Sequence, residues 1–237
     1  MLLLGVAKSG SAALEDMMKN FRKAVIHGIT RAFDGFFKID EVDVSHLQRD
    51  GKMSRQKREV FERGDSVAVL LHRVDAESVV LVNQFKVPAL VGRRRDDPAT
   101  SDGWITELPA GMIGKNETAE QAVIRETAEE TGYRIKNPRL IGKFFSSPGG
   151  ASERIFLYFA EVRMTDQVDA GGGLGGEDIT VIDMPLGELF ERLDNRTIDD
   201  PKLEIGAYWL KDYLNKRIAA ASRMRIRPMR HPPHSAR

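Results

Sequence analysis

Four glutamates and one arginine are concentrated in a short segment near the middle of the chain. Glu117 comes first, and Arg125, Glu126, Glu129 and Glu130 follow within the next 13 residues. One arginine cannot neutralise this many carboxylates. Mg²⁺ prefers oxygen ligands and is often held by one or two carboxylates together with substrate phosphates. The segment therefore indicates a divalent-metal site that acts on a phosphate-containing molecule.

A helix must carry most of these acids. The run Thr118-Ala-Glu-Gln121 has the form of a capping box, and Gly132 stands where a glycine ends a helix. The predicted helix therefore extends from Thr118 to Thr131. At about 100° per residue, one broad face gathers small and apolar residues that should pack on a sheet. These are Ala119, Val123, Ile124, Thr127 and Ala128.

Glu130 falls inside this apolar face, Glu126 lies at its edge, and Glu129 is one step further round. Burying an unpaired carboxylate is costly unless the group pairs or binds a cation. The ordinary alternative for a glutamate-rich helix is a solvated face with ion pairs four residues apart. The position of Glu130 argues against that alternative and favours a bound cation.

The acids belong to a longer pattern with fixed spacing. It is Gly111-x5-Glu117-x7-Arg125-Glu126-x2-Glu129-Glu130-x-Gly132-Tyr133. This pattern resembles the signature of the Nudix hydrolases. Chance agreement at its seven fixed positions, which extend from Gly111 to Gly132, is below about one in a million. Thr127 departs from the family, which usually has a bulkier aliphatic residue there. The departure bears on local packing.

The resemblance implies roles for the residues of this segment. Glu126, Glu129 and Glu130 would hold Mg²⁺, with Mn²⁺ as the alternative, and the carbonyl of Ala110 would help. Arg125 would orient the carboxylates through charge-assisted pairs. Arg125 and Glu129 are thus the expected catalytic residues of the helix. The expected reaction is metal-assisted hydrolysis of a diphosphate bridge.

Further motifs resemble the ADP-ribose pyrophosphatases of this family. They are Arg58-Glu-Val-Phe-Glu-Arg63, Gln84-Phe-Lys86 and Ser147-Pro-Gly-Gly-Ala-Ser-Glu153. The resemblance implies that Arg58, Lys86, Glu107 and Glu153 bind substrate. Lys86 stands where arginine is common, which weakens bidentate phosphate contact. The resemblance of these three motifs makes ADP-ribose the first expected substrate, with AMP and ribose 5-phosphate as products.

The glycine-rich loop before the last predicted strand raises two alternatives. Asp169-Ala-Gly-Gly-Gly-Leu-Gly-Gly-Glu177-Asp178 resembles the corresponding loop of bacterial GDP-mannose hydrolases, so GDP-mannose, giving GMP and mannose 1-phosphate, is the alternative substrate. In the ADP-ribose enzymes a glutamate matching Glu177 is the candidate general base. An acid on a mobile loop suits a base that closes over substrate. Asp178 is the alternative base.

Composition excludes other classes of function. The formal net charge is +1, which gives no field that steers the chain to nucleic acid or membrane. There is no cysteine, and no run of about 18 apolar residues is present. We expect a cytoplasmic enzyme with no membrane contact and no specific nucleic acid partner. A non-catalytic Nudix ligand-binding module is the alternative class. Arg93 to Arg95 are interpreted as solvated loop residues, with phosphate contact as the alternative.

The pattern of elements predicts an α/β (α+β) fold, since strands and helices are mixed without regular alternation. The resemblance implies the Nudix α/β/α sandwich around a mixed sheet. Expected divisions are an N-terminal extension (1–34), N-terminal strands (35–65), the Nudix domain (66–220) and a basic, disordered tail (221–237). Within the extension, residues 12–31 are compatible with an amphipathic helix. The resemblance also implies a homodimer that exchanges the early strands, with Arg58 acting on the neighbouring subunit.

Outside the acidic helix, hydrophobic alternation and turn residues set the remaining elements. Strands are predicted over 36–44, 58–63, 66–72, 78–85, 104–108, 140–146, 154–162 and 179–184, helices over 186–193 and 203–217, and a polar loop over 92–103.

Overall fold

The computed structural model describes residues 23–97, 99 and 102–225, with the side chains of 223–225 left aside. The chain forms two compact units. One contains the N-terminal residues as far as Asp65 together with Phe144–Arg154. The other contains Ser66–Lys143 and the residues from Ile155 onward. Each unit is described by itself.

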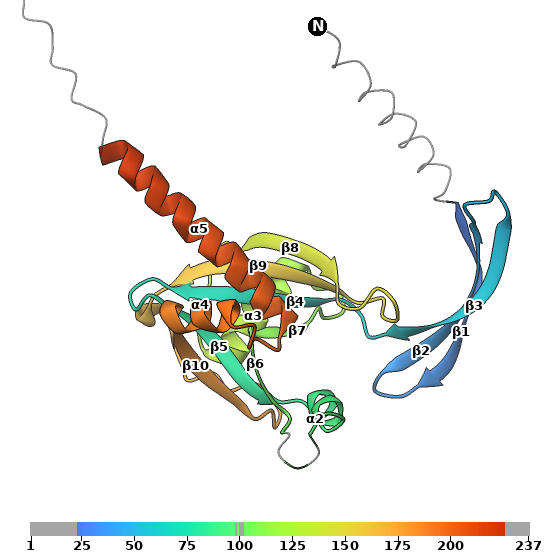
Figure 1. Ribbon diagram of the computed structural model, residues 1–237. Coiled ribbons are helices and arrows are strands. Elements are labelled where there is room, and N and C mark those ends of the chain that lie inside the picture. Colours follow the sequence, from blue (N-terminus) through green and yellow to red (C-terminus); the bar gives the residue numbers. More distant parts are fainter. Residues whose placement is uncertain (1–22, 98, 100–101, 226–237) are drawn as a thin grey trace, which may run out of the picture. The chain divides into compact units, whose positions relative to one another are not determined.

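The N-terminal unit is built on a three-stranded antiparallel sheet in the order β1-β2-β3 (Figure 1). Its strands are β1 (Ala24–Asp34), β2 (Lys38–Leu47) and β3 (Met53–Glu62). The amphipathic helix expected over 12–31 is wrong from Ala24 onward. Several β-branched residues in this stretch favour a strand, and pairing along the whole of β2 satisfies its backbone. Residues 12–22 lie outside the described residues.

The second unit contains a seven-stranded mixed sheet. Its central order is β10-β5-β4-β9-β8, with β6 beside β5 and β7 beside β4. Strands β4 and β9 are parallel, whereas β5 is antiparallel to both β4 and β10. The strands are β4 (Ser66–Arg73), β5 (Ser78–Phe85), β6 (Trp104–Glu107), β7 (Ala110–Met112), β8 (Arg139–Phe145), β9 (Arg154–Val162) and β10 (Ile179–Pro185).

Helices cover both faces of this sheet (Figure 1). α3 (Ala119–Thr131) packs on β4, β5 and β7, where Val67, Val69 and Leu71 of β4 join its core. The intervening residue Leu70 faces the other side and lies beside Gly206 of α5. Because β4 is buried on both faces, it reads as a continuous apolar run. The predicted α/β/α sandwich around a mixed sheet is confirmed.

Three local differences from the sequence-based predictions concern this unit. α2 (Val87–Arg93) was not predicted, and its last two residues are the first two of the expected polar loop. Pro88 near its start is compatible with a first helical turn. The short strand β7 was not predicted. After α4 (Leu186–Asp194), α5 (Pro201–Arg225) continues eight residues beyond Arg217, so residues 221–225 of the expected tail are helical. Residues 226–237 lie outside the described residues.

The buried face of α3 is rotated relative to the helical wheel. Val123 and Thr127 are buried as expected, whereas Ile124 is 36% exposed. Ala122 and Thr131 take its place in the interior. Glu130 is buried, as its position on the wheel predicted. Among the described residues, no helix has the length and apolar character needed to cross a bilayer.

Candidate active site

Both ends of α3 are fixed by the local sequence. The Thr118 hydroxyl accepts a hydrogen bond from the Gln121 backbone N–H, and the Gln121 side chain accepts from the Thr118 N–H at 2.9 Å. At the other end Gly132 takes the left-handed conformation with φ 73° and its N–H donates to the Ala128 carbonyl. This capping box and glycine cap fix where the helix starts and stops. They therefore fix the directions in which its acids project.

Arg125 connects three of the predicted carboxylates. Its guanidinium donates two hydrogen bonds to Glu117, at 2.9 Å each, one to Glu126 at 2.8 Å and one to Glu129 at 3.0 Å. A further bond reaches the Met112 carbonyl. Chiefly because of Arg125, and further because of a backbone N–H, the pKa of Glu117 is lowered to about 2. The predicted orienting role of Arg125 is consistent with this geometry.

Glu130 is a buried carboxylate, with 6% of its surface exposed. One of its oxygens accepts a hydrogen bond from the Ala110 N–H at 2.9 Å. Burial raises the pKa of Glu130 to about 8, a rise that the Ala110 N–H opposes and nearby Glu126 and Glu107 reinforce. Burial also raises the pKa of Glu126. Glu126 and Glu130 are thus both held in surroundings where the charged carboxylate needs a positive partner.

The residues present fit a divalent cation by their chemistry. Each of Glu126, Glu129 and Glu130 has one oxygen engaged as above and a second oxygen without a hydrogen-bond partner among the described residues. In this conformation, no three His, Asp or Glu side chains of the described part of the chain are arranged around one point to hold a metal ion. Arg125 instead holds Glu126 and Glu129 together, and the Ala110 N–H holds Glu130.

Gly111 makes room for one of these acids. A Cβ atom on Gly111 would lie 1.9 Å from Cδ of Glu126. We expect Gly111→Ala to push the Glu126 carboxylate aside and to lower kcat/KM by about 10- to 100-fold. The melting temperature should stay near that of the wild type, because the displaced atoms end a flexible side chain. Gly92→Ala, where an added Cβ meets nothing within 4 Å, is the control. A Gly111→Ala enzyme with wild-type kcat/KM would show that this placement of Glu126 is unnecessary.

Glu107 lies in a buried network of charges. One of its oxygens pairs with Lys86 Nζ at 3.1 Å and the other with Lys202 Nζ at 3.0 Å. Lys202 also pairs with Asp200 at 2.7 Å. Burial alone would lower the pKa of Lys202, but Asp200 and Glu107 together raise it. Both oxygens of Glu107 thus hold lysines, and the substrate contacts expected of Glu107 and Lys86 stay predictions. No sequence motif indicated Lys202 as a residue of this site.

The other two predicted substrate-binding residues belong to the N-terminal unit. Arg58 lies on β3, is exposed, and donates to the Lys57 carbonyl. Glu153 is buried, and Arg63 Nε lies 3.7 Å from one of its oxygens. In the same unit the turn that begins at Ser147 pairs with Phe61 of β3 through backbone hydrogen bonds. Arg58 and Glu153 thus belong to the same unit, whereas the acids of α3 belong to the other unit.

The glycine-rich loop is tied to α3 rather than free in solvent. The N–H groups of Gly172 and Gly173 donate to the carbonyls of Glu130 and Glu129, at 2.9 and 3.0 Å. Gly171 packs so closely that a Cβ would lie 2.4 Å from the Glu130 carbonyl oxygen. These residues have φ between 66° and 110°, which glycine adopts readily. The first half of the loop is therefore held against the C-terminal end of α3.

Glu177 is held within this loop. Its carboxylate accepts a hydrogen bond from the Leu174 N–H at 3.0 Å. It lies near enough to Glu126 to add slightly to the rise that burial gives the pKa of Glu126. Glu177 and Asp178 also line a groove of about 360 Å³, together with Gln84 and Phe85 at the end of β5. The sequence did not single out Phe85 as a site residue.

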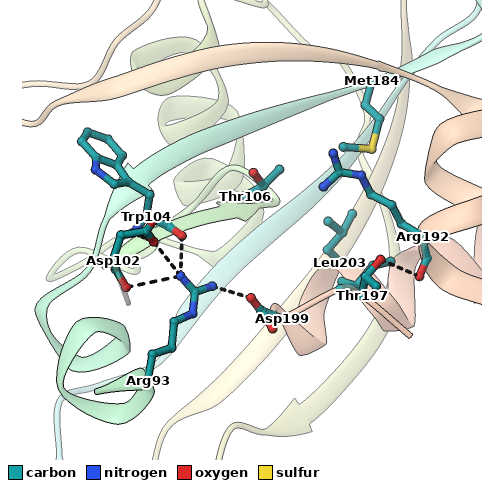
Figure 2. A pocket seen from close by; sticks show the side chains of 10 residues that line it. Arg93, Asp102, Trp104, Thr106, Met184, Arg192, Thr197, Asp199 and Leu203 are labelled. Atoms are coloured by element: carbon teal, nitrogen blue, oxygen red, sulfur yellow. Dashed lines mark hydrogen bonds and ion pairs between the residues drawn. The ribbon is translucent and has the colours of Figure 1, made fainter. Parts of the chain in front are cut away.

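A second hollow, of about 240 Å³, lies between β6 and the start of α5 (Figure 2). Arg93 reaches into it from the end of α2 and donates to the Asp102 carboxylate at 2.9 Å and to the Trp104 carbonyl at 3.0 Å. It also pairs with Asp199 (Figure 2). Arg93 ends a helix where a loop was expected, and it joins three separate segments of the chain while 32% of its side chain stays exposed.

Comparisons with known proteins agree with this arrangement. Residues 62–203 match the NUDIX domain family. GDP-mannose pyrophosphatases of Cronobacter sakazakii and Salmonella arizonae are each 34% identical to this chain over 169 residues, which are 71% of this chain and 85% of each relative. A solved structure described as that of an ADP compounds hydrolase has a TM-score of 0.62 at 16% identity, and the match covers 83% of this chain and 97% of that one. The fold, the family match and these relatives show that the chain belongs to the Nudix hydrolase family.

Proposed function

We propose that this protein hydrolyses the diphosphate bridge of a nucleoside diphosphate sugar in a Mg²⁺-dependent reaction, releasing a nucleoside monophosphate and a sugar phosphate. The observation that carries the proposal is the set of acids on α3, with Glu130 buried and Arg125 bridging Glu126 and Glu129. A buried acid whose pKa is raised to about 8 needs a strong positive partner to act in its charged form.

The chain's own residues divide the work in this proposal. Glu126, Glu129 and Glu130 would hold Mg²⁺, or Mn²⁺ in its place, and the bound ion would neutralise the diphosphate and activate water. Arg125 keeps two of these carboxylates in position. Glu177 removes a proton from the attacking water, with Asp178 as the alternative base.

Two substrates are supported by separate observations. GDP-mannose comes first, because relatives at 34% identity are named GDP-mannose pyrophosphatases. ADP-ribose, the first expectation from the motifs around Arg58 and Lys86, is the second candidate. The structure described as an ADP compounds hydrolase supports ADP-ribose only through its fold, since the identity is 16%.

A homodimer is part of the proposal. The strand β1 exposes apolar side chains along its length, including Val25, Ile26, Ile29 and Phe33, each more than half exposed in the single chain. Exposed apolar patches of this kind mark protein–protein contacts. A partner subunit that covers β1 would bury them. Sedimentation equilibrium should give twice the mass of one chain, and a fully active monomer would contradict this part of the proposal.

The function is tested with purified full-length protein and a panel of GDP-mannose, ADP-ribose, ADP-glucose and NADH. We expect Mg²⁺-dependent release of nucleoside monophosphate, loss of activity with EDTA, and recovery on adding Mg²⁺. The preferred substrate is the one with the highest kcat/KM. If none is hydrolysed with Mg²⁺ or Mn²⁺ while nucleotide sugars still bind, the protein is a Nudix ligand-binding module.

A further inference from the structure

Arg93 is the last residue of α2, and its side chain holds two other segments of the chain, as Figure 2 shows. The guanidinium donates to the Asp102 carboxylate at 2.9 Å and to the carbonyl of Trp104, the first residue of β6, at 3.0 Å. It also pairs with Asp199, which lies between α4 and α5. One cation thus joins the end of α2, the start of β6 and the stretch before α5.

The same three segments carry the buried charge network around Glu107. Lys86 directly precedes α2, Glu107 is the last residue of β6, and Lys202 is the second residue of α5. The Nζ atoms of the two lysines lie 3.1 and 3.0 Å from separate oxygens of Glu107. Asp200, the neighbour of Asp199, pairs with Lys202 at 2.7 Å. The contacts of Arg93 and the network at Glu107 therefore connect the same elements.

β6 and the start of α5 are positioned in different ways. β6 is held in register by antiparallel pairing with β5. Residues 195–200 belong to no helix or strand, so sheet pairing does not set their distance from β6. The pair between Asp199 and Arg93 ties this stretch to the start of β6. The placement of Lys202, three residues further along the chain, follows from that tie.

The position of Lys202 affects the lysine on the other oxygen of Glu107. A buried carboxylate that loses its cationic partner is strongly destabilised. If Lys86 were the sole partner of Glu107, a substrate phosphate would have to compete with this carboxylate for the lysine. With Lys202 in place, Glu107 keeps a cation when Lys86 turns to a phosphate. The expected phosphate contact of Lys86 therefore costs less free energy when Lys202 is correctly placed.

We propose that Arg93 is a positioning residue of the active site. By holding Asp199 at the start of β6, it keeps Lys202 on Glu107. Lys86 is then free to leave Glu107 for a phosphate of the substrate. This inference rests on the proposed function, to which it adds a residue outside the acidic helix. Arg93 itself contacts neither the substrate nor the metal ion.

Steady-state kinetics of the full-length protein provide the first test. For Arg93→Ala and for Asp199→Ala we expect KM for the preferred nucleotide sugar to rise about tenfold and kcat to change less than about twofold, since a phosphate-binding lysine stabilises substrate and transition state alike. The double variant should be no worse than either single variant, because both remove the same connection.

Arg192→Ala is the matched control for these variants. Arg192 lines the same hollow as Arg93 but pairs with Glu188 of its own helix, so its KM should stay at the wild-type value. An unchanged KM in Arg93→Ala, additive losses in the double variant with Asp199→Ala, or an equal rise in Arg192→Ala would overturn the assignment.

Acylation of lysines in the metal-free protein needs no turnover, so it separates this inference from the proposed function. The two carboxylate partners of Lys202 raise its pKa against the effect of burial. In Arg93→Ala these contacts loosen, and Lys202 should react with N-hydroxysuccinimidyl acetate about fivefold faster, because more of its amine is unprotonated. Lys211, further along α5, should keep its rate. Mass spectrometry of peptides measures both rates.

The two assays fail in different ways. If no nucleotide sugar is hydrolysed, the proposed function is wrong, and faster acylation confined to Lys202 still supports its placement by Arg93. If Lys202 keeps its wild-type rate in Arg93→Ala, or if Lys211 accelerates equally, Arg93 does not position Lys202 and the inference is wrong.

Discussion

Glu130→Gln is expected to lower Mg²⁺-dependent turnover by about three orders of magnitude while the protein stays folded. Glutamine keeps the shape of the side chain and can still accept the hydrogen bond from the Ala110 N–H. It cannot supply the negative charge that a divalent ion needs, and charge stabilisation by the ion contributes several kcal/mol to catalysis of this kind. The measurement is kcat for the preferred nucleotide sugar with saturating Mg²⁺.

The same substitution should lower activity but raise the stability of the metal-free protein at high pH. The pKa of Glu130 is raised to about 8, so the fold favours its protonated form. The stability that this proton contributes is fully present below the unfolded-state pKa near 4.5 and is lost as the pH rises through about 8. Metal-free Glu130→Gln should therefore melt at a higher temperature than the wild type at pH 9 and at a similar temperature at pH 4.5.

Added Mg²⁺ should raise the melting temperature of the wild type and leave that of Glu130→Gln nearly unchanged, because metal binding stabilises only a state with the ligand charge in place. Glu120→Gln removes an exposed acid from the first turn of the same helix and should behave like the wild type in all these assays. Wild-type turnover in Glu130→Gln would show that the metal assignment is wrong.

Glu177→Gln is expected to lower kcat by about 100-fold, the lower end of the range for a general base, and to change KM little. Asp178→Asn should change kcat little in comparison. Both acids line the groove, so the pair distinguishes the two alternatives for the base. A large loss of kcat in Asp178→Asn with a normal Glu177→Gln enzyme would move the base to Asp178.

A glycine substitution provides an independent test of Glu177. A Cβ on Gly173 would lie 2.4 Å from the Glu177 carboxylate, whereas a Cβ on Gly175 meets nothing within 4 Å. Both glycines have positive φ, at 80° and 63°, so an alanine costs roughly 1 kcal/mol of backbone strain at either position. Gly173→Ala should therefore lower kcat far more than Gly175→Ala. It should also lose more stability, because its Cβ would lie 2.9 Å from Cδ1 of Ile179, so kcat is compared at a temperature where both variants are folded. Equal activities would mean that the position of Glu177 does not matter.

Some features of the site follow from local sequence. The ends of α3 were predicted correctly because the capping box and Gly132 act within a few residues of the helix. The burial of Glu130 followed from its place in a pattern with helical period. Strand β5 was predicted from 78 to 85, and the structure has the same bounds. In each case, the signal and the structure it encodes lie in one short stretch of chain.

Other features depend on residues that are distant in sequence. Lys202 contacts Glu107 although the two residues are 95 positions apart in the sequence. No local pattern around either residue indicates its partner. The pairing of β1 with β2 prevailed over the helical interpretation of residues 24–31. The rotation of α3 that exposes Ile124 is set by what the sheet presents to the helix. The intrinsic preference of residues for helix or strand is weak, and such tertiary packing overrides it.

The sequence by itself determined the helix that bears the acids, because spacing along one helix fixes which carboxylates share a face. It also contained the family signature, and the resemblance to the Nudix hydrolases implied diphosphate chemistry. Only the tertiary structure decided that the amides of Gly172 and Gly173 attach the loop that carries Glu177 to the carbonyls of Glu130 and Glu129. It also decided that the end of β5 lines one groove with Glu177. The physical reason is that these contacts arise from the path of the chain between strands, which no local pattern of residues specifies.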